Sequence, residues 1–281
     1  MQSQKQFPRL FSFEFFPPNT PEGNEKLRAT AAELALLKPK FFSVTYGAGG
    51  STRERTLDTV LDIRKMGHAA APHISCVAST HGNIREWLQR YKDNGIKHLV
   101  ALRGDLPSGV AATGEFRHAN ELVEFIRREF GDAFHIEVAA YPEFHPQAKS
   151  ARDDLDNFKR KVDAGAHSAI TQYFYNADAY YRFVDACEKR RIAIPIVPGI
   201  MPIGRFSQLA RFSDACGAEI PRWMRKTLEG YGDDSDSIRA FGLDVVTALC
   251  ESLLKNGAPG LHFYTLNQAA LTKTIWQRLN L

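Results

Sequence analysis

The chain has 281 residues, and 36 lysines and arginines against 32 aspartates and glutamates give it a formal charge of +4. With 44% hydrophobic and 24% charged residues it has the composition of an ordinary folded globule, which excludes a disordered or fibrous chain. A charge this small does not indicate a nucleic-acid partner. The four cysteines form no CxxC pair, so neither a structural zinc site nor a disulfide scaffold is indicated.

Uncharged stretches are too short to span a bilayer, and the N-terminal sequence MQSQKQFPRL lacks the apolar segment of a signal peptide. We therefore expect a cytoplasmic protein with no membrane partner.

Short apolar runs alternate with stretches of helical periodicity along the chain. The runs predict eight strands, at residues 10–15, 41–45, 71–76, 97–102, 134–141, 169–174, 194–199 and 261–264. The periodic stretches predict helices at residues 22–37, 52–65, 83–94, 119–130, 151–164, 177–189, 206–215, 235–254 and 268–279. One strand and one helix together take about 35 residues, the size of a βα repeat.

Two architectures satisfy this alternation: a (β/α)8 barrel and an open, doubly wound parallel sheet. A doubly wound dinucleotide domain should carry GxGxxG after an early strand, and residues 46–51 match neither that pattern nor a P-loop. The fold class expected is therefore an α/β (β/α)8 TIM barrel, with residues 1–281 as one domain.

A barrel carries its chemistry where strands end and βα loops begin. The residues at those positions are Glu14, Thr45, Tyr46, His73, Arg103, Gly104, Asp105, Tyr141, Glu143, His145, Gln172, Pro198, Gly199, Tyr264 and Thr265. Polar and titratable groups thus gather at one rim, which is the distribution of an enzyme.

Glu14 lies among Phe13, Phe15 and Phe16 at the end of the first strand. A carboxyl group with apolar neighbours would be desolvated and able to donate a proton near neutral pH. The alternative is a glutamate on the outward face, paired with a lysine or arginine.

A second group of polar residues follows the fourth and fifth strands. In the tripeptide RGD at residues 103–105, the glycine permits close backbone approach and Asp105 can accept hydrogen bonds, although an ion pair across a turn explains it equally well. Asp154, Asn157 and Lys161 share one face of the helix at 151–164, with Arg160 near it. Such a face suits ribose and pyrophosphate oxygens, whereas the plainer interpretation is a solvated helix surface.

Other site classes find little support. His73, His145 and Glu143 match no metal-ligand spacing, so no metal site is expected. No GxSxG elbow follows a strand, which argues against a serine hydrolase.

Seven motifs in order resemble the 5,10-methylenetetrahydrofolate reductase family. They are FEFFPP at 13–18, SVTYGA at 43–48, APH at 71–73, ALRGDLP at 101–107, AYPE at 140–143 with HP at 145–146, TQ at 171–172 and HFYTLN at 262–267. Each is weak alone, but seven in the family's order across nearly the whole chain are specific.

The resemblance implies an FAD-containing barrel in which NADH or NADPH and then 5,10-methylenetetrahydrofolate exchange hydride with the flavin in ping-pong fashion, giving 5-methyltetrahydrofolate for methionine synthesis. Glu14 then matches the general acid and Asp105 a residue between the pterin and the flavin. The FAD-binding positions implied are Thr45, Tyr46, Ala48, His73, Arg103, Gly104, Asp105, Ala119, Tyr141, His145, Ala148, Asp154, Asn157, Arg160 and Lys161. The substrate-binding positions implied are Glu14, Thr45, Asp105, Gln172, Phe206 and Gln268.

One position departs from the family pattern. Bacterial relatives commonly carry arginine after HFYTLN, where this chain has Gln268, and glutamine cannot pair ionically with a folate carboxylate. The chain ends with the barrel, so we expect no S-adenosylmethionine-binding domain. Family resemblance also implies a homo-oligomer. Two alternatives stay open: another flavin barrel enzyme, such as a proline-dehydrogenase-like oxidase, and a barrel that binds folate or flavin without turnover.

Overall fold

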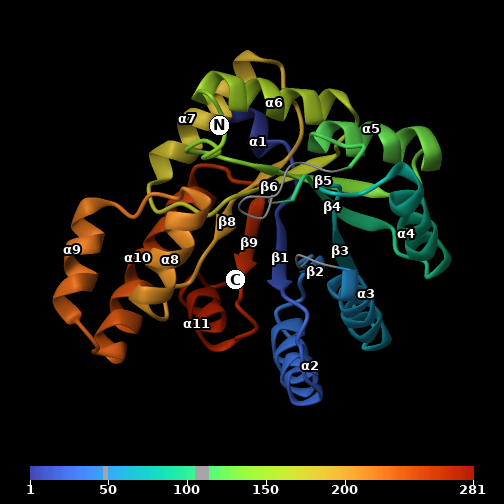
Figure 1. The fold of residues 1–281 in the computed structure, drawn as a ribbon. Coiled ribbons are helices and arrows are strands. Elements are labelled where there is room, and N and C mark those ends of the chain that lie inside the picture. The colour runs from blue at the N-terminus through green and yellow to red at the C-terminus, as the bar shows by residue number, and fades with distance from the viewer. Residues whose placement is uncertain (47–49, 105–113) are drawn as a thin grey trace.

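The computed structural model describes residues 1–46, 50–104 and 114–281, with the backbone alone at residues 50–52. Within them nine parallel strands form one sheet in the order β7-β6-β5-β4-β3-β2-β1-β9-β8. The strands are β1 Leu10–Phe15, β2 Phe41–Val44, β3 Ala70–Ser75, β4 His98–Leu102, β5 His135–Ala140, β6 Ser168–Thr171, β7 Ile196–Val197, β8 Gly199–Ile200 and β9 Gly260–Tyr264. The sheet curves into a nearly closed barrel with helices around its outside (Figure 1), which confirms the predicted fold class.

The barrel closes at Pro198, where the single strand predicted at 194–199 is divided into β7 and β8. The first half pairs with β6 and the second with β9. The Pro198 carbonyl accepts a hydrogen bond from the His262 amide at 2.9 Å, although proline has no N–H to give to a ladder. Gly199 follows because a Cβ there would lie 2.1 Å from the Thr171 carbonyl oxygen and 2.7 Å from the Tyr264 ring. The sequence pattern could not show this change of neighbour.

The helices cover the outer surface of the sheet (Figure 1). They are α1 Gln2–Lys5, α2 Pro21–Ala35, α3 Gly50–Lys65, α4 His81–Asp93, α5 Ala119–Phe130, α6 Ala151–Asp163, α7 Ala177–Lys189, α8 Phe206–Cys216, α9 Arg222–Tyr231, α10 Ser235–Lys255 and α11 Ala270–Arg278. Of these, α1 and α9 were not predicted. None of the helices described is both long and apolar enough to cross a membrane.

Alternation along each strand divides the side chains between two environments. The larger hydrophobic core lies between the strands and the helices and includes Phe13 and Phe15. The barrel interior holds a small apolar cluster of Phe41, Ala71 and Ile170. It also holds buried polar side chains, and because buried polar groups are unusual they are candidates for functional residues. They are Ser12, Ser43, His73, Glu137, Ser168 and His262.

Candidate active site

Glu14 lies at the carboxyl end of β1 and faces the barrel interior, with 16% of its side chain exposed. The neighbouring Phe13 and Phe15 do not surround it. They point to the opposite face, where they pack on Phe42 with ring centroids 6.0 and 5.4 Å away. The apolar surroundings expected from the sequence are therefore wrong for these two residues, because successive side chains of a strand alternate between faces.

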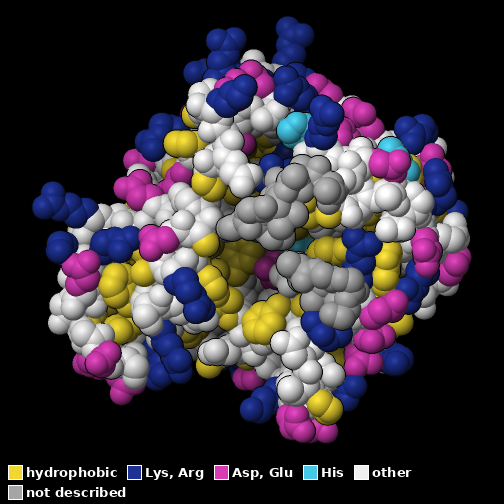
Figure 2. Space-filling model, in the orientation of Figure 1, with side chains coloured by type: hydrophobic (Ala, Val, Ile, Leu, Met, Phe, Trp, Pro, Cys, Tyr) yellow, Lys and Arg dark blue, Asp and Glu magenta, His cyan; other side chains and the backbone are white. Residues whose placement is uncertain are grey.

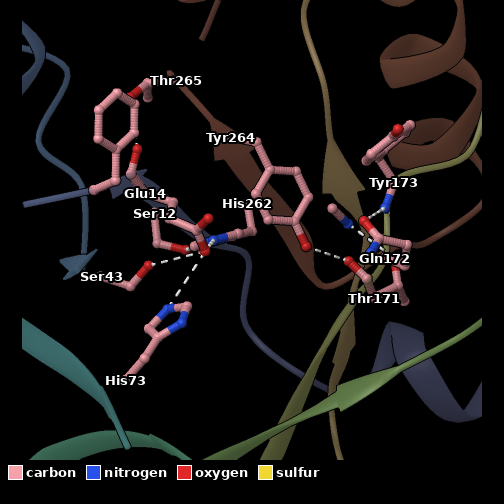
Figure 3. A network of polar contacts seen from close by, with 12 residues as sticks. Ser12, Glu14, Ser43, His73, Thr171, Gln172, Tyr173, His262, Tyr264 and Thr265 are labelled. Atoms are coloured by element: carbon pink, nitrogen blue, oxygen red, sulfur yellow. Dashed lines mark hydrogen bonds and ion pairs between the residues drawn. The ribbon is translucent and has the colours of Figure 1, made fainter. Parts of the chain in front are cut away.

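The carboxyl group of Glu14 instead faces two imidazoles and a hydroxyl (Figure 3). Its Oε2 lies 3.4 Å from His73 Nε2, 3.4 Å from His262 Nε2 and 3.5 Å from Ser43 Oγ. These separations are long for hydrogen bonds, so the three neighbours hold the carboxyl group only loosely.

The two imidazoles are held from different strands. Nδ1 of His262, on β9, lies 2.7 Å from Ser12 Oγ in the barrel interior. Burial lowers the pKa of His73, on β3, although the Glu14 carboxyl group opposes that shift. His73 is therefore neutral at physiological pH.

A cavity of about 460 Å³ opens above this cluster at the strand ends. Its wall is mostly apolar and aromatic, and hydrophobic side chains form the floor of the central hollow in Figure 2. The residues that line it are Glu14, Phe16, Thr45, Tyr46, His73, Val100, Leu102, Ala139, Tyr141, Ile170, Gln172, Tyr173, Met201, Phe212, Ala215, Cys216, Tyr264 and Leu266. An apolar wall with a few convergent polar groups is the usual form of a small-molecule site.

Tyr264 and Gln172 also line this cavity, and Figure 3 shows Tyr264 between the Glu14 cluster and Gln172. The Tyr264 hydroxyl donates to the Thr171 carbonyl at 2.7 Å, and burial holds the pKa of this phenol well above its ordinary range. Gln172 Oε1 accepts from the Tyr173 amide at 3.0 Å. That bond orients the side chain, so its NH₂ group can donate to a ligand.

A second cavity, of about 260 Å³, shares Leu102, Ala139 and Tyr141 with the central one. The remaining residues of its wall are Ala101, Arg103, Gly104, His118, Ala119, Asn120, His145, Gln147, Ala148, Asp154, Asn157 and Lys161. It thus brings together, from four elements, most of the predicted cofactor positions. The helical face selected from the sequence does point into a cavity.

Helix α6 supplies the polar face of this second cavity. Ser150 caps the helix by accepting from the Asp153 amide at 3.1 Å, and Asp154 accepts from the His145 amide at 3.0 Å. The Lys161 ammonium donates to the Ala139 carbonyl, and burial lowers the pKa of Lys161 to about 8. A half-buried ammonium of this kind favours an anionic ligand.

Gly104 follows β4 and allows the backbone to turn beside this cavity. Its φ is +87°, and a Cβ there would lie 2.0 Å from Ser75 Oγ. Beside it, Arg103 donates to the Gln147 side chain and, at 3.1 Å, to the Gly104 carbonyl. Asp105 and Ala48, both predicted site residues, lie outside the described residues, so their assignments stay predictions.

Three predicted residues lie apart from both cavities. Arg160 donates to Asn157 Oδ1 at 2.6 Å and lines a separate outer hollow. Phe206 is the first residue of α8 and packs half-buried against the core, whereas Phe212 lines the central cavity. Gln268 lines a third cavity, of about 630 Å³, which shares Tyr264 and Leu266 with the central one.

Sequence reasoning gave no role to His262, Ser43 or Ser12. His262 and Ser43 lie within recognised motifs, but only the strand register shows that they face Glu14. In β1, Ser12 pairs with His262 and Glu14 with Ser43. The available signal was the alternation of β9, which puts His262 and Tyr264 on the inward face.

The fold and the rim define a barrel of the enzyme class, with an acidic group and two imidazoles at its mouth and adjoining cavities along one edge. The methylenetetrahydrofolate reductase family model matches residues 1–280. The chain belongs to this family, as its sequence motifs predicted.

Individual relatives agree with that assignment. A 5,10-methylenetetrahydrofolate reductase of Escherichia coli (strain K12) is 44% identical over 269 residues, which cover 95% of this chain and 90% of that protein. A probable methylenetetrahydrofolate reductase (NADH) of Oryza sativa subsp. japonica is 38% identical, over 97% of this chain and 48% of its own.

Solved structures support the fold. A Clostridium thermocellum protein that binds two copies of 5-methyl-5,6,7,8-tetrahydrofolic acid superposes with a TM-score of 0.70 at 16% identity, over 99% of this chain and 97% of that one. At this identity the likeness shows the architecture alone.

Proposed function

We propose that this chain is a flavin-dependent oxidoreductase that uses NADH or NADPH to reduce 5,10-methylenetetrahydrofolate to 5-methyltetrahydrofolate. The observation that carries the proposal is Glu14, placed beside His73 and His262 on the wall of a cavity that adjoins a cationic one. Family membership supplies the reaction class, and the site supplies groups that suit it.

The second cavity fits FAD by the chemistry of its donors. Lys161 and Arg103 offer positive charge for a diphosphate, Asn157 offers an amide, and Asp154 can accept from ribose hydroxyls. Lys161 is the strongest argument, because among the described residues its half-buried ammonium donates to a single carbonyl oxygen, with the Asp154 carboxylate as the charge that acts on it. When bound, FAD supplies hydride acceptance and donation in the central cavity.

Glu14 would protonate the folate nitrogen that must leave its carbon when the five-membered ring opens. The carboxyl group lies on the wall of the central cavity, where a bound folate could reach it. His73 and His262 lie beside it at 3.4 Å. Asp105 remains proposed as the residue between pterin and flavin, on the family resemblance.

One cavity would serve both substrates in turn. Gln172 and the aromatic wall offer a hydrogen-bond donor and a flat apolar surface, which suit a nicotinamide as well as a pterin. The cavity volume of about 460 Å³ lies within the usual range of small-molecule sites, and we infer that the two substrates occupy it in turn. This supports ping-pong exchange.

The third cavity offers positive charge that replaces the arginine missing at position 268. Arg205, Arg211 and Arg239 line it together with Gln268, and its described wall contains no acidic side chain. It adjoins the central cavity at Tyr264 and Leu266. We infer that the glutamate carboxylates of folate lie here, with Gln268 donating a neutral hydrogen bond.

The decisive experiment is an anaerobic titration of the FAD-loaded protein with NADH, followed by its visible absorption. We expect the flavin band to bleach and to return when 5,10-methylenetetrahydrofolate is added. Proline is tested as the competing reductant of the flavin, since an oxidase of that type would bleach with proline and not with NADH.

Each outcome bears on a different part of the proposal. Bleaching by NADH without recovery on folate would contradict the folate half-reaction. A protein that cannot be reconstituted with FAD would overturn the flavin assignment. Binding of folate without any turnover would make the chain a folate-binding barrel.

A further inference from the structure

The amino end of the barrel, opposite the candidate active site, carries a second cluster of ionisable side chains. His98 opens β4, His135 opens β5, and Glu137 follows two residues later on the same inward face. His98 and His135 are direct partners in the parallel ladder, and their rings meet at 4.6 Å between centroids. Nothing in the folate chemistry proposed for the opposite rim uses this cluster.

Two of the polar atoms in the cluster are buried without a hydrogen bond. They are Nε2 of His98 and Oε2 of Glu137, and Glu137 is only 1% exposed. His98 Nε2 lies 3.3 Å from Glu137 Oε1, but without the alignment of a hydrogen bond. A buried carboxylate and a buried imidazole nitrogen left in this state are costly, and a shared ligand would remove that cost.

Among the residues that the structure describes, His98, His135 and Glu137 form the one group whose ligand atoms all lie within 4.8 Å of one another. Two ligand atoms on a tetrahedral Zn²⁺ lie roughly 3.4 Å apart, given bonds of about 2.0 to 2.1 Å. The distance of 3.3 Å between His98 and Glu137 matches this spacing. A small rotation of the exposed His135 side chain would bring in the third ligand.

Groups around the cluster support the ligands. Ser168 Oγ donates to Glu137 Oε1 at 3.1 Å and lies 2.7 Å from His135 Nε2. His167 stacks on His135 at 4.7 Å, and Arg127 bonds to His167 on the far side.

We propose that His98, His135 and Glu137 bind a divalent transition-metal ion, of the Zn²⁺ class, at the amino end of the barrel. Two imidazoles and one carboxylate are the donor set of Zn²⁺ and its neighbours, whereas Mg²⁺ and Ca²⁺ take oxygen ligands. Solvent at the exposed side of His135 supplies the fourth ligand. The ion would tie the starts of β4 and β5 together, a stabilising role that suits this end of a barrel.

The test is equilibrium dialysis of the chelator-treated holoenzyme against ZnCl₂, with metal analysis, together with thermal unfolding. We expect one Zn²⁺ per chain, a higher Tm with Zn²⁺ and an unchanged kcat. Glu137→Gln keeps the side-chain shape, and His135→Asn alters only an exposed residue. Each should weaken Zn²⁺ binding by at least about tenfold and abolish the rise in Tm.

His81→Asn is the matched control. His81 Nδ1 pairs with Glu115 at 2.9 Å on the surface, with no third ligand among the described residues, so this variant should bind Zn²⁺ like the parent. Failure of the wild-type protein to bind one equivalent would overturn the proposal. Unchanged affinity in both cluster variants would also overturn it, because the ion would then lie elsewhere, as at His73 and His262.

Discussion

At the scale of single residues, the site depends on one carboxyl group whose surroundings are polar and loosely bonded. Glu14 faces His73, His262 and Ser43 at 3.4 to 3.5 Å, and burial keeps His73 neutral. No other acidic side chain among the described residues lines the central cavity. Under the proposed function, Glu14 is therefore the one carboxyl group of the described wall that could supply the proton for ring opening.

We expect Glu14→Gln to separate the two half-reactions. Glutamine fills the same space and accepts hydrogen bonds but cannot deliver a proton, so folate reduction should fall by about 10²- to 10⁴-fold. Reduction of the flavin by NADH should change little, because that step needs no acid. Stopped-flow absorption measures both rates, and a variant that reduces folate at the wild-type rate would exclude Glu14 as the acid.

The lowered pKa of Lys161 predicts that FAD affinity and the stability of the flavin-free protein respond to pH in opposite directions. Burial places its pKa at about 8, below the ordinary 10.5, and a bound diphosphate favours the charged form. Above about pH 8, FAD binding then requires proton uptake, so affinity should fall by up to about tenfold per pH unit. The unfolded chain holds this proton more tightly, so the flavin-free protein should gain stability as pH rises from 8 towards 10.5.

Quenching of flavin fluorescence measures this affinity across the pH range. Lys161→Met should bind FAD more weakly at neutral pH and lose the pH dependence. Lys159→Met is the control, since Lys159 pairs with Asp163 at 2.6 Å and does not line the cavity. An equal pH slope in Lys161→Met would assign the effect to another group.

At the scale of elements, the cofactor groups depend on how α6 begins. Ser150 Oγ accepts from the Asp153 amide, and the same first turn carries Asp154. Ser150→Ala should cost about 1 kcal/mol of unfolding free energy and should weaken FAD binding, since Asp154, Asn157 and Lys161 share that helix.

Asn176→Ala is the control that separates a loss of folding stability from a loss of FAD binding. Asn176 caps α7 in the same way, accepting from the Asp178 amide at 3.0 Å, but α7 contributes nothing to the second cavity. Chemical denaturation and FAD titration of both variants form the measurement. Equal loss of FAD affinity in the two would show that α6 has no particular role.

The sequence predicted the elements that are long or strongly patterned. Helical periodicity predicted the starts of α6, α7 and α10 to the residue, and the structure shows that Ser150, Asn176 and Asp234 cap these helices. Helix α9 was not predicted because only two of its residues, Met224 and Leu228, are buried, which leaves little hydrophobic periodicity in the sequence. The division at Pro198 depends on which neighbour each half-strand meets, and that information lies in the distant strands β6 and β9.

The same limit applies to the site. Glu14 and the polar face of α6 could be selected locally, one from its strand end and the other from helical periodicity. The partnership of Glu14 with His262 and Ser43 joins residues far apart in the chain and follows only from strand register. Both Phe206 and Phe212 of α8 pack partly buried against the core, but only Phe212 lines the central cavity, so a role for Phe206 stays a prediction.

At the scale of the whole molecule, three cavities follow one another along the carboxyl rim of the barrel. The cationic cavity on α6 adjoins the central one through Leu102, Ala139 and Tyr141, and the arginine-lined cavity adjoins it through Tyr264 and Leu266. The barrel thus offers positive charge on both sides of an apolar centre. This order suits a cofactor diphosphate, two stacked ring systems and an anionic folate tail.

Arg239→Gln tests the far end of that arrangement. Arg239 lines the third cavity on α10 and is partly engaged by Asp236 at 3.2 Å, so we expect a moderate rise in the KM for methylenetetrahydrofolate, about threefold to tenfold. The rise should be larger for a folate with several glutamates and should shrink at high salt. The KM for NADH should not change.

Arg222→Gln is the control. It removes the same charge from exposed α9, outside the wall of the third cavity, and should leave both KM values as they are. A rise in both constants for Arg239→Gln, or none in either, would show that the folate tail lies elsewhere on the rim.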